Sequence, residues 1–170
     1  MTDFFELAEG RYSVRRFAAD AVEPEKLARV LEAGRVAPTA HNEQPQRIKT
    51  ITDAGELAKV DECTTCRYGA PTVLLVCYDK TVCWKRPFDA ALSGEVDAAI
   101  VTTHMMLAAH ELGLGTCWVM YFDPEKTSEL FSLPENIVPA AMLPIGYPVE
   151  NSAPSHMHGK RSELTKLLLK

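Results

Sequence analysis

The chain has 170 residues, 46% of them hydrophobic, which is the size of one ordinary domain with a single core. Its formal net charge of -5 provides no basic surface of the kind that attracts nucleic acids or anionic membranes, so we expect neither as a partner. The first ten residues lack the apolar run of a signal peptide, and we therefore expect a cytoplasmic protein.

Hydrophobic periodicity, caps and turn residues predict the order of the elements. We expect helices over residues 4–9, 23–34, 54–60, 96–112, 123–131 and 162–170, and strands over residues 48–51, 72–78, 116–119 and 140–147. Thr2 or Asp3 would cap the first helix and Gly10 would end it. Residues 1–170 are thus predicted to form one domain of mixed α and β structure around a sheet of about four strands.

An arginine-rich stretch follows the first helix. In an extended backbone, Arg11, Ser13 and Arg15 project to one side, while Tyr12 and Val14 project to the other. Guanidinium groups match phosphate oxygens in geometry and charge, so this pattern is suited to binding a phosphate. The alternative from the residues alone is a solvated basic segment.

The segment PTAHNEQPQRI, residues 38–48, is rich in proline and side-chain amides. Such a loop could hold a flat heterocycle by hydrogen bonds, and it could equally be an ordinary polar loop.

Cys63 and Cys66 form a lone CxxC motif. A structural zinc site needs four ligands, and no second pair stands at a suitable spacing, so we interpret these cysteines as structural and expect no metal site. Further along, Trp84 and Phe88 lie in an irregular segment and are candidates for a lid.

The helix over residues 96–112 is apolar around most of its circumference. Asp97, His104 and Glu111 recur at i, i+7 and i+14, which predicts one thin stripe facing water. The rest of this helix must be covered by protein, from this domain or from a second copy. Gly113 is expected to end it in a left-handed conformation.

Near the C-terminus, Lys160 and Arg161 precede the predicted helix over residues 162–170. Cations at a helix start oppose the helix dipole, and a bound phosphate would compensate for them. His156 and His158, in the preceding loop, are interpreted as exposed side chains.

Five motifs in order, RYSVRRF, APTAHNEQP, GEVDAAI, GLGTCWV and IGYP followed by a KR pair, resemble the nitroreductase family of FMN-dependent oxidoreductases. The resemblance covers nearly the whole chain. It implies an α+β sandwich with a mostly antiparallel sheet of about four to five strands flanked by helices, and a homodimer with shared FMN sites. It also implies that NADH or NADPH gives a hydride to flavin N5, and that the flavin then reduces an electron-poor acceptor such as a nitroaromatic or a quinone.

Carried over residue by residue, the resemblance implies a set of FMN contacts: Arg11, Tyr12, Ser13, Arg15, Pro38, Thr39, Ala40, Asn42, Gln44, Trp118, Val119, Met120, Tyr121, Lys160 and Arg161. In this set, residues 38–42 would come from the partner subunit. The Met120 amide would lie near flavin N5, and Arg67 is a candidate for a cation near N1 and O2. No side chain is expected to act as acid or base.

The sequence leaves two other functions open. The first is a flavin-binding carrier or sensor that does not turn over NAD(P)H. The second is a cysteine-metal module built on Cys63 and Cys66. Tyr121 stands where relatives often have glycine. The larger tyrosine side chain would narrow the space above the flavin ring, and this affects which substrate can bind rather than whether FMN binds.

Overall fold

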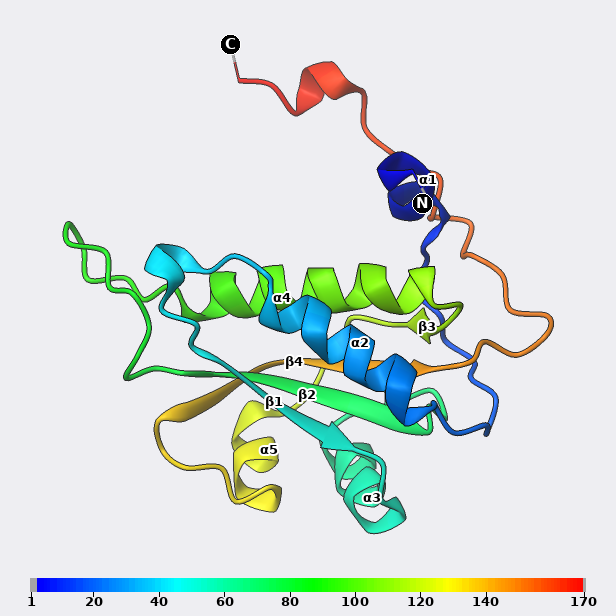
Figure 1. Cartoon of the computed structure of the whole chain (residues 1–170), viewed down its shortest axis with the longest axis horizontal. Coiled ribbons are helices and arrows are strands. Elements are labelled where there is room, and N and C mark those ends of the chain that lie inside the picture. The colour runs from blue at the N-terminus through cyan, green and yellow to red at the C-terminus, as the bar shows by residue number, and fades with distance from the viewer. Residues whose placement is uncertain (1–2, 170) are drawn as a thin grey trace.

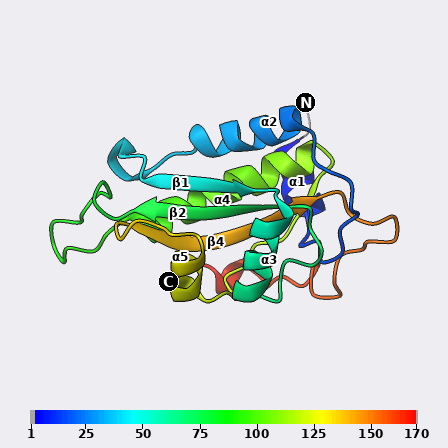
Figure 2. The same cartoon turned by 90° about the horizontal axis from the view of Figure 1, so that it is seen from below.

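The structure, a computed structural model, describes residues 3–169 of the chain (Figure 1). Within these residues a four-stranded antiparallel sheet lies between two layers of helices. As Figures 1 and 2 show, one face is covered by α2 (Pro24–Arg35) and α4 (Gly94–Glu111), and the other by α3 (Ala54–Cys63) and α5 (Pro124–Leu130). The expected α+β sandwich is confirmed.

The order of strands across the sheet is β1-β2-β4-β3. Their bounds are Gln46–Ile51 for β1, Thr72–Asp79 for β2, Gly115–Thr116 for β3 and Ile137–Gly146 for β4. The apolar run of β2 is buried on both faces, because Leu74 and Val76 pack in the cluster with α4 residues, whereas Val73 and Leu75 pack in the opposite cluster. A strand covered by helices on both sides needs no polar alternation.

The helix α4 is the longest in the described part of the chain, and it buries Ala98, Val101, Met105 and Ala109 toward the sheet and α2. Gly113, with a φ of 78°, ends it as expected. The predicted water-facing stripe is wrong at Asp97, which is 1% exposed. No helix among residues 3–169 is both long and apolar enough to cross a bilayer.

Two predicted elements are shorter than expected. The strand over residues 116–119 is reduced to β3, although the Val119 amide still donates to the Met142 carbonyl of β4 at 2.9 Å. The helix over residues 162–170 is wrong. Among residues 162–169 only a 3-10 turn, η2 (Leu164–Lys166), forms, and the side chain of Leu169 is fully exposed. A short helix without a surface to pack against is unstable in water, which explains the difference.

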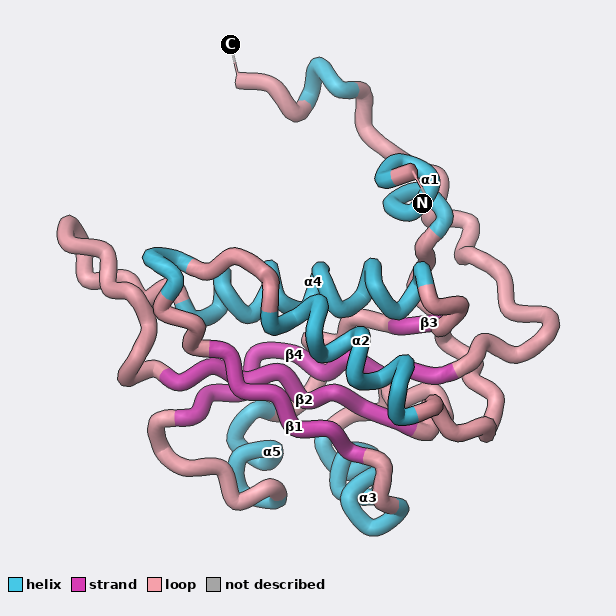
Figure 3. Tube along the Cα trace, viewed as in Figure 1, coloured by secondary structure: helices cyan, strands magenta, loops and turns pink. Residues whose placement is uncertain are grey.

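The first helix, α1 (Phe4–Gly10), has no buried residues and lies with the C-terminal segment apart from the sheet (Figures 1 and 3). Its N-cap is Asp3, whose side chain makes no capping hydrogen bond; Thr2, the other predicted cap, lies outside the described residues. Phe4 and Phe5 are 62% and 68% exposed. Both ends of the chain therefore carry apolar side chains that the single chain does not cover.

Candidate functional site

The arginine-rich stretch lies extended beside β3. The Val14 amide donates to the Thr116 carbonyl at 2.9 Å, and Ser13 pairs with Thr116 in a parallel bridge. Val14 is buried, while Arg15 is exposed. A Cβ at Gly115 would lie 2.6 Å from Val14 Cγ2, so glycine at this position is what lets the stretch approach β3. The pairing fixes which side chains face outward.

Arg11, Ser13 and Arg15 line one cavity of about 200 Å³ together with Arg161. The remaining lining residues are Tyr12, Ser155, Met157 and His158. Among residues 3–169, no carboxylate lies within ion-pair distance of the guanidinium groups of Arg11, Arg15 and Arg161. Clustered cations repel one another unless an anion compensates them, so this cavity, here called the arginine cavity, is suited to a phosphate.

The C-terminal segment reaches the arginine cavity through Arg161, whose guanidinium donates to the carbonyls of His158 and Lys160. Lys160 does not line the cavity. Because no α-helix forms over residues 162–169, that described segment offers no α-helix N-terminus to join in binding an anion. The Tyr12 hydroxyl donates to the Ser152 carbonyl at 3.3 Å, which ties this segment to the arginine-rich stretch.

The loop before β1 is tightly folded and contains the turn η1 (Ala40–Asn42). Thr39 accepts two hydrogen bonds: its carbonyl from the Asn42 amide at 3.0 Å, and its hydroxyl from the Gln44 amide at 3.1 Å. His41, Asn42 and Gln44 have left-handed φ values of 56°, 58° and 51°. Pro38, Asn42 and Gln44 are exposed, so the loop presents polar side chains outward.

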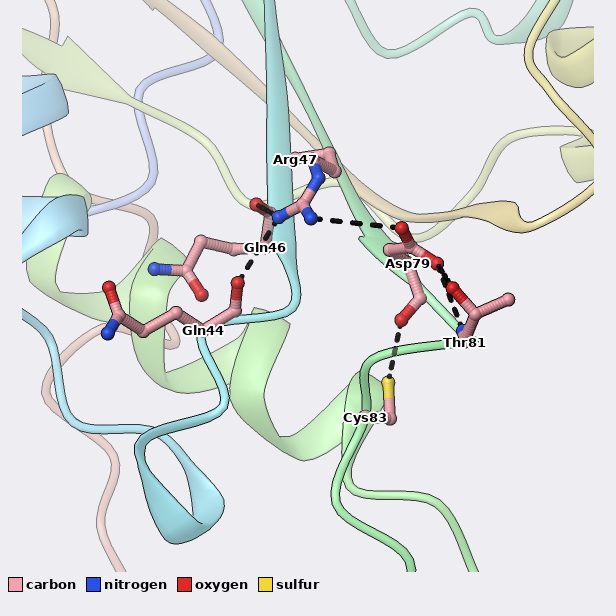
Figure 4. Close-up of polar contacts among 6 residues, drawn as sticks. All are labelled: Gln44, Gln46, Arg47, Asp79, Thr81 and Cys83. Atoms are coloured by element: carbon pink, nitrogen blue, oxygen red, sulfur yellow. Dashed lines mark hydrogen bonds and ion pairs between the residues drawn. The ribbon is translucent and has the colours of Figure 1, made fainter.

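The end of this loop is held by Arg47 of β1 (Figure 4). Arg47 Nη1 donates to the Gln44 carbonyl at 3.2 Å, and Nη2 lies 3.7 Å from Asp79 Oδ2. The Thr81 hydroxyl donates to Asp79 at 2.6 Å and is the largest of the causes that lower the pKa of Asp79 to about 2. Cys83 Sγ donates to the Asp79 carbonyl at 3.2 Å.

The start of the loop is held by Asp97 of α4. The Ala40 amide donates to Asp97 Oδ1 at 2.8 Å, and the Ser93 hydroxyl donates to Asp97 Oδ2 at 2.6 Å. The i, i+7, i+14 spacing of Asp97 with two other polar residues predicts a solvated position, and the structure shows that this prediction is wrong. The feature of the sequence that could have indicated a hydrogen-bonded Asp97 is Ser93, because it precedes Asp97 by four residues and so lies on the same side of the helix.

A larger cavity, of about 680 Å³, lies along the first half of α4. Trp118, Met120 and Phe122 line it together with residues 139–141 of β4. Trp118 Nε1 is buried and has no acceptor among the described residues. Most of the cavity wall is apolar, and the lining side chain of Trp118 contains one buried donor without a partner among the described residues, Nε1.

Met120 also lines a second cavity, of about 430 Å³, with Tyr121 and Cys63–Thr65. Val119 lies between these residues in sequence but is buried in the core, where it packs with Met142. Trp84 and Phe88 line neither of these cavities, and Phe88 is 94% exposed.

Arg67 differs from the arginines of the arginine cavity, because it has a carboxylate partner. Its Nε and Nη2 donate to the two carboxylate oxygens of Asp61, both at 2.7 Å, and Nη1 donates to the Ala70 carbonyl at 2.9 Å. Its charge is therefore compensated within the chain.

All five cysteines are free thiols, and residues 3–169 contain no cluster of three or more potential metal ligands. Cys63 is buried at the end of α3, and Cys66 is half-buried. The Tyr68 hydroxyl is the largest of the causes that lower the pKa of the Cys66 thiol, with smaller contributions from Thr64, Thr65 and the charge of Arg15.

These features define an α+β protein with a cavity lined by three arginines, a tightly folded polar loop and a large apolar cavity. The sequence profile of the Nitroreductase family matches residues 8–67 and 66–147, which is most of the chain. The chain belongs to the nitroreductase family.

The chain is similar to a crystal structure of a nitroreductase family protein from Clostridium difficile 630, with 42% identity, a TM-score of 0.93 and coverage of 99% of this chain and 98% of that chain. A crystal structure from Desulfovibrio desulfuricans, in complex with FMN, is 27% identical, with a TM-score of 0.82 and coverage of 100% and 97%. A Methanothermobacter thermautotrophicus protein named as an NADH dehydrogenase/NAD(P)H nitroreductase is 31% identical over 158 residues, which are 88% of this chain and 79% of that protein.

Proposed function

We propose that this chain is an FMN-dependent NAD(P)H oxidoreductase that passes reducing equivalents to an electron-poor acceptor such as a nitroaromatic or a quinone. Family membership supports FMN-dependent oxidoreduction, since the Desulfovibrio neighbour is in complex with FMN and the Methanothermobacter relative is named for NAD(P)H. The observation that carries the proposal is the arginine cavity, where Arg11, Arg15 and Arg161 have no described carboxylate partner.

The donor set of this cavity fits the phosphate of FMN. A phosphate dianion would offset two of the three guanidinium charges, and Ser13 and Tyr12 would add hydroxyl contacts. Lys160, which does not line the cavity, is left out of the proposed phosphate contacts.

Trp118, Met120 and Tyr121 would lie against the flavin ring. The Met120 backbone amide donates to no acceptor among residues 3–169, which leaves it available for flavin N5. Val119 is left out because its side chain is in the core, and Arg67 because Asp61 already compensates its charge. Bound FMN would accept a hydride at N5 from NADH or NADPH and give it to the acceptor. The chain would supply position and charge, and the proton that the acceptor needs beside the hydride would come from solvent, so no side chain need move it.

We propose that the working form is a homodimer. The uncovered apolar side chains of α1 and the C-terminal segment, together with Val96, which is 63% exposed on α4, support a partner of the same kind. Pro38, Thr39, Ala40, Asn42 and Gln44 would then reach the flavin bound by the second subunit.

The first experiment is an absorbance spectrum of the purified protein, followed by anaerobic titration with NADH and with NADPH. Flavin bands near one FMN per chain that bleach with either nucleotide support the enzyme and identify its electron donor. Flavin that is bound but not reduced by either one identifies a carrier or sensor instead. A colourless protein that FMN cannot reconstitute would overturn the proposal.

Mixed dimers test whether the sites are shared. One chain carries Arg15→Ala and the other carries Asn42→Gly, because glycine removes the side chain while tolerating the left-handed φ of 58° at this position. If each site takes Arg15 from one chain and Asn42 from the other, the mixed dimer regains one intact site of two, whereas both parent dimers have none. A mixed dimer in which no site binds FMN more tightly than the sites of the parent dimers would reject shared sites.

A further inference from the structure

The buried carboxylate of Asp97 stands at the junction between α4 and the loop of residues 39–44. Both of its oxygens are used: Oδ1 accepts from the Ala40 amide at 2.8 Å, and Oδ2 accepts from the Ser93 hydroxyl at 2.6 Å. A buried carboxylate is costly unless hydrogen bonds compensate for the water it has lost. Asp97 meets that requirement by holding the loop backbone, so its burial and the position of the loop are linked.

The loop needs an anchor of this kind because its backbone is strained. His41, Asn42 and Gln44 have left-handed φ values of 56°, 58° and 51° within four positions. A left-handed conformation is unfavourable for a residue with a side chain, and several in one loop persist only where the surroundings fix them. The backbone amides of Asn42, Glu43 and Gln44 all donate back to Thr39 or Ala40, so these hydrogen bonds shape the turn without attaching it to the body of the protein.

Two attachments connect this turn to the body. Arg47 holds the Gln44 carbonyl at the end of the loop, next to β1, and the Asp97 carboxylate holds the Ala40 amide at its start. The end is further fixed by the chain itself, because β1 begins at Gln46 and the Asp79 amide donates to the Pro45 carbonyl at 2.8 Å. On the other side, α2 ends at Arg35 and Ala37 is buried in the core, and Asp97 supplies the hydrogen bond that ties the first amide of the turn to α4.

We infer that Asp97 is a positioning residue for the flavin site: through the Ala40 amide it fixes the loop of residues 39–44 in the conformation that contacts FMN. This inference rests on the proposed function for the FMN contact, but the anchoring of Ala40 can be measured without FMN. Hydrogen bonding, not charge, is the property that matters, because both contacts of Asp97 are donated to it by uncharged groups of this chain.

Asparagine is the informative substitution, since its amide oxygen can accept from the Ala40 amide and its NH₂ group can donate to the Ser93 hydroxyl. Asp97→Ala removes both contacts. Asp53→Ala is the matched control, because Asp53 also accepts two hydrogen bonds, from Gly55 and Glu56, at the start of α3 on the opposite face of the sheet (Figure 1).

Two readouts are needed: FMN affinity by quenching of flavin fluorescence, and amide hydrogen exchange of Ala40 in the protein without FMN. We expect Asp97→Ala to weaken FMN binding about tenfold to a hundredfold and to speed exchange at Ala40 at least about tenfold. Asp97→Asn should stay within about threefold of wild type in both, and Asp53→Ala should leave both unchanged even if it lowers the melting temperature.

Wild-type FMN affinity in Asp97→Ala would overturn the inference, and so would an Asp97→Asn protein as impaired as Asp97→Ala, because charge would then be the operative property. If Asp97→Ala does not fold, Ser93→Ala replaces it. That variant loses the contact that orients the carboxylate and should raise exchange at Ala40, and unchanged exchange would count against the inference. A wild-type protein that binds no FMN refutes the proposed function instead, and exchange at Ala40 still decides whether Asp97 anchors the loop.

Discussion

Replacing Arg15 with alanine separates a binding role from a structural one. In the chain itself, Arg15 makes one long hydrogen bond, from Nη1 to the Ser13 carbonyl at 3.4 Å, and its side chain is exposed. Losing it should therefore change the free energy of unfolding by no more than about 0.5 kcal/mol, as for an ordinary surface position. Losing a charge-assisted contact to the FMN phosphate should cost about 1.5–3 kcal/mol of binding free energy, or roughly 10- to 150-fold in Kd.

The control for this variant is its neighbour in sequence. Arg16→Ala removes the same charge one residue later, and Arg16 does not line the arginine cavity. Fluorescence titration of FMN into each protein after removal of bound flavin, with thermal melts alongside, gives both quantities. Equal FMN affinities for the Arg15→Ala and Arg16→Ala proteins would refute the phosphate role of the cavity, since net charge would then explain any loss.

Three further outcomes follow from other parts of the structure. A Cβ at Gly94 would lie 2.2 Å from a ring carbon of Tyr78, so Gly94→Ala should destabilise the fold by about 1–3 kcal/mol in chemical denaturation. The pKa of Asp79 is lowered to about 2, so its carboxylate stabilises the fold above about pH 4, and this contribution is lost as pH falls toward 2; Asp79→Asn should flatten that part of the acid-unfolding curve. A hydrogen bond from Tyr68 lowers the pKa of the Cys66 thiol. In the Tyr68→Phe protein, the pH dependence of Cys66 alkylation by iodoacetamide should therefore shift to higher pH.

The sequence was sufficient to predict those elements whose own residues form a clear hydrophobic pattern. The strand β2 is apolar at nearly every position, and α4 is apolar around most of its circumference, so each could be predicted without knowing its neighbours. The alternation of the arginine-rich stretch likewise predicted that Val14 packs inward. In each case the side chains of one short segment contain the information.

The sequence was insufficient where structure depends on a surface elsewhere. Residues 162–169 have helix-forming side chains, but Leu167 and Leu168 are 70% and 62% exposed and contact no core, so only η2 forms. The arginine cavity combines Arg11 and Arg15 with Arg161, which is far away in sequence. Spacing alone could not show that these three share a cavity, and the family resemblance was needed to join them.

Asp97 shows why a correct helix can still lead to a wrong interpretation of its residues. The i, i+7, i+14 spacing placed it with Glu111, and Glu111 is exposed, yet Asp97 is buried because the loop of residues 39–44 crosses its end of α4. Helical periodicity says which residues share a face but not what covers that face at each turn. In this chain the buried acid in the first turn of α4 accepts from a hydroxyl four residues before it and from a backbone amide of another segment. In this fold that segment is the strained loop, so the same carboxylate that departs from the amphipathic pattern is the one that fixes the loop proposed to bind FMN.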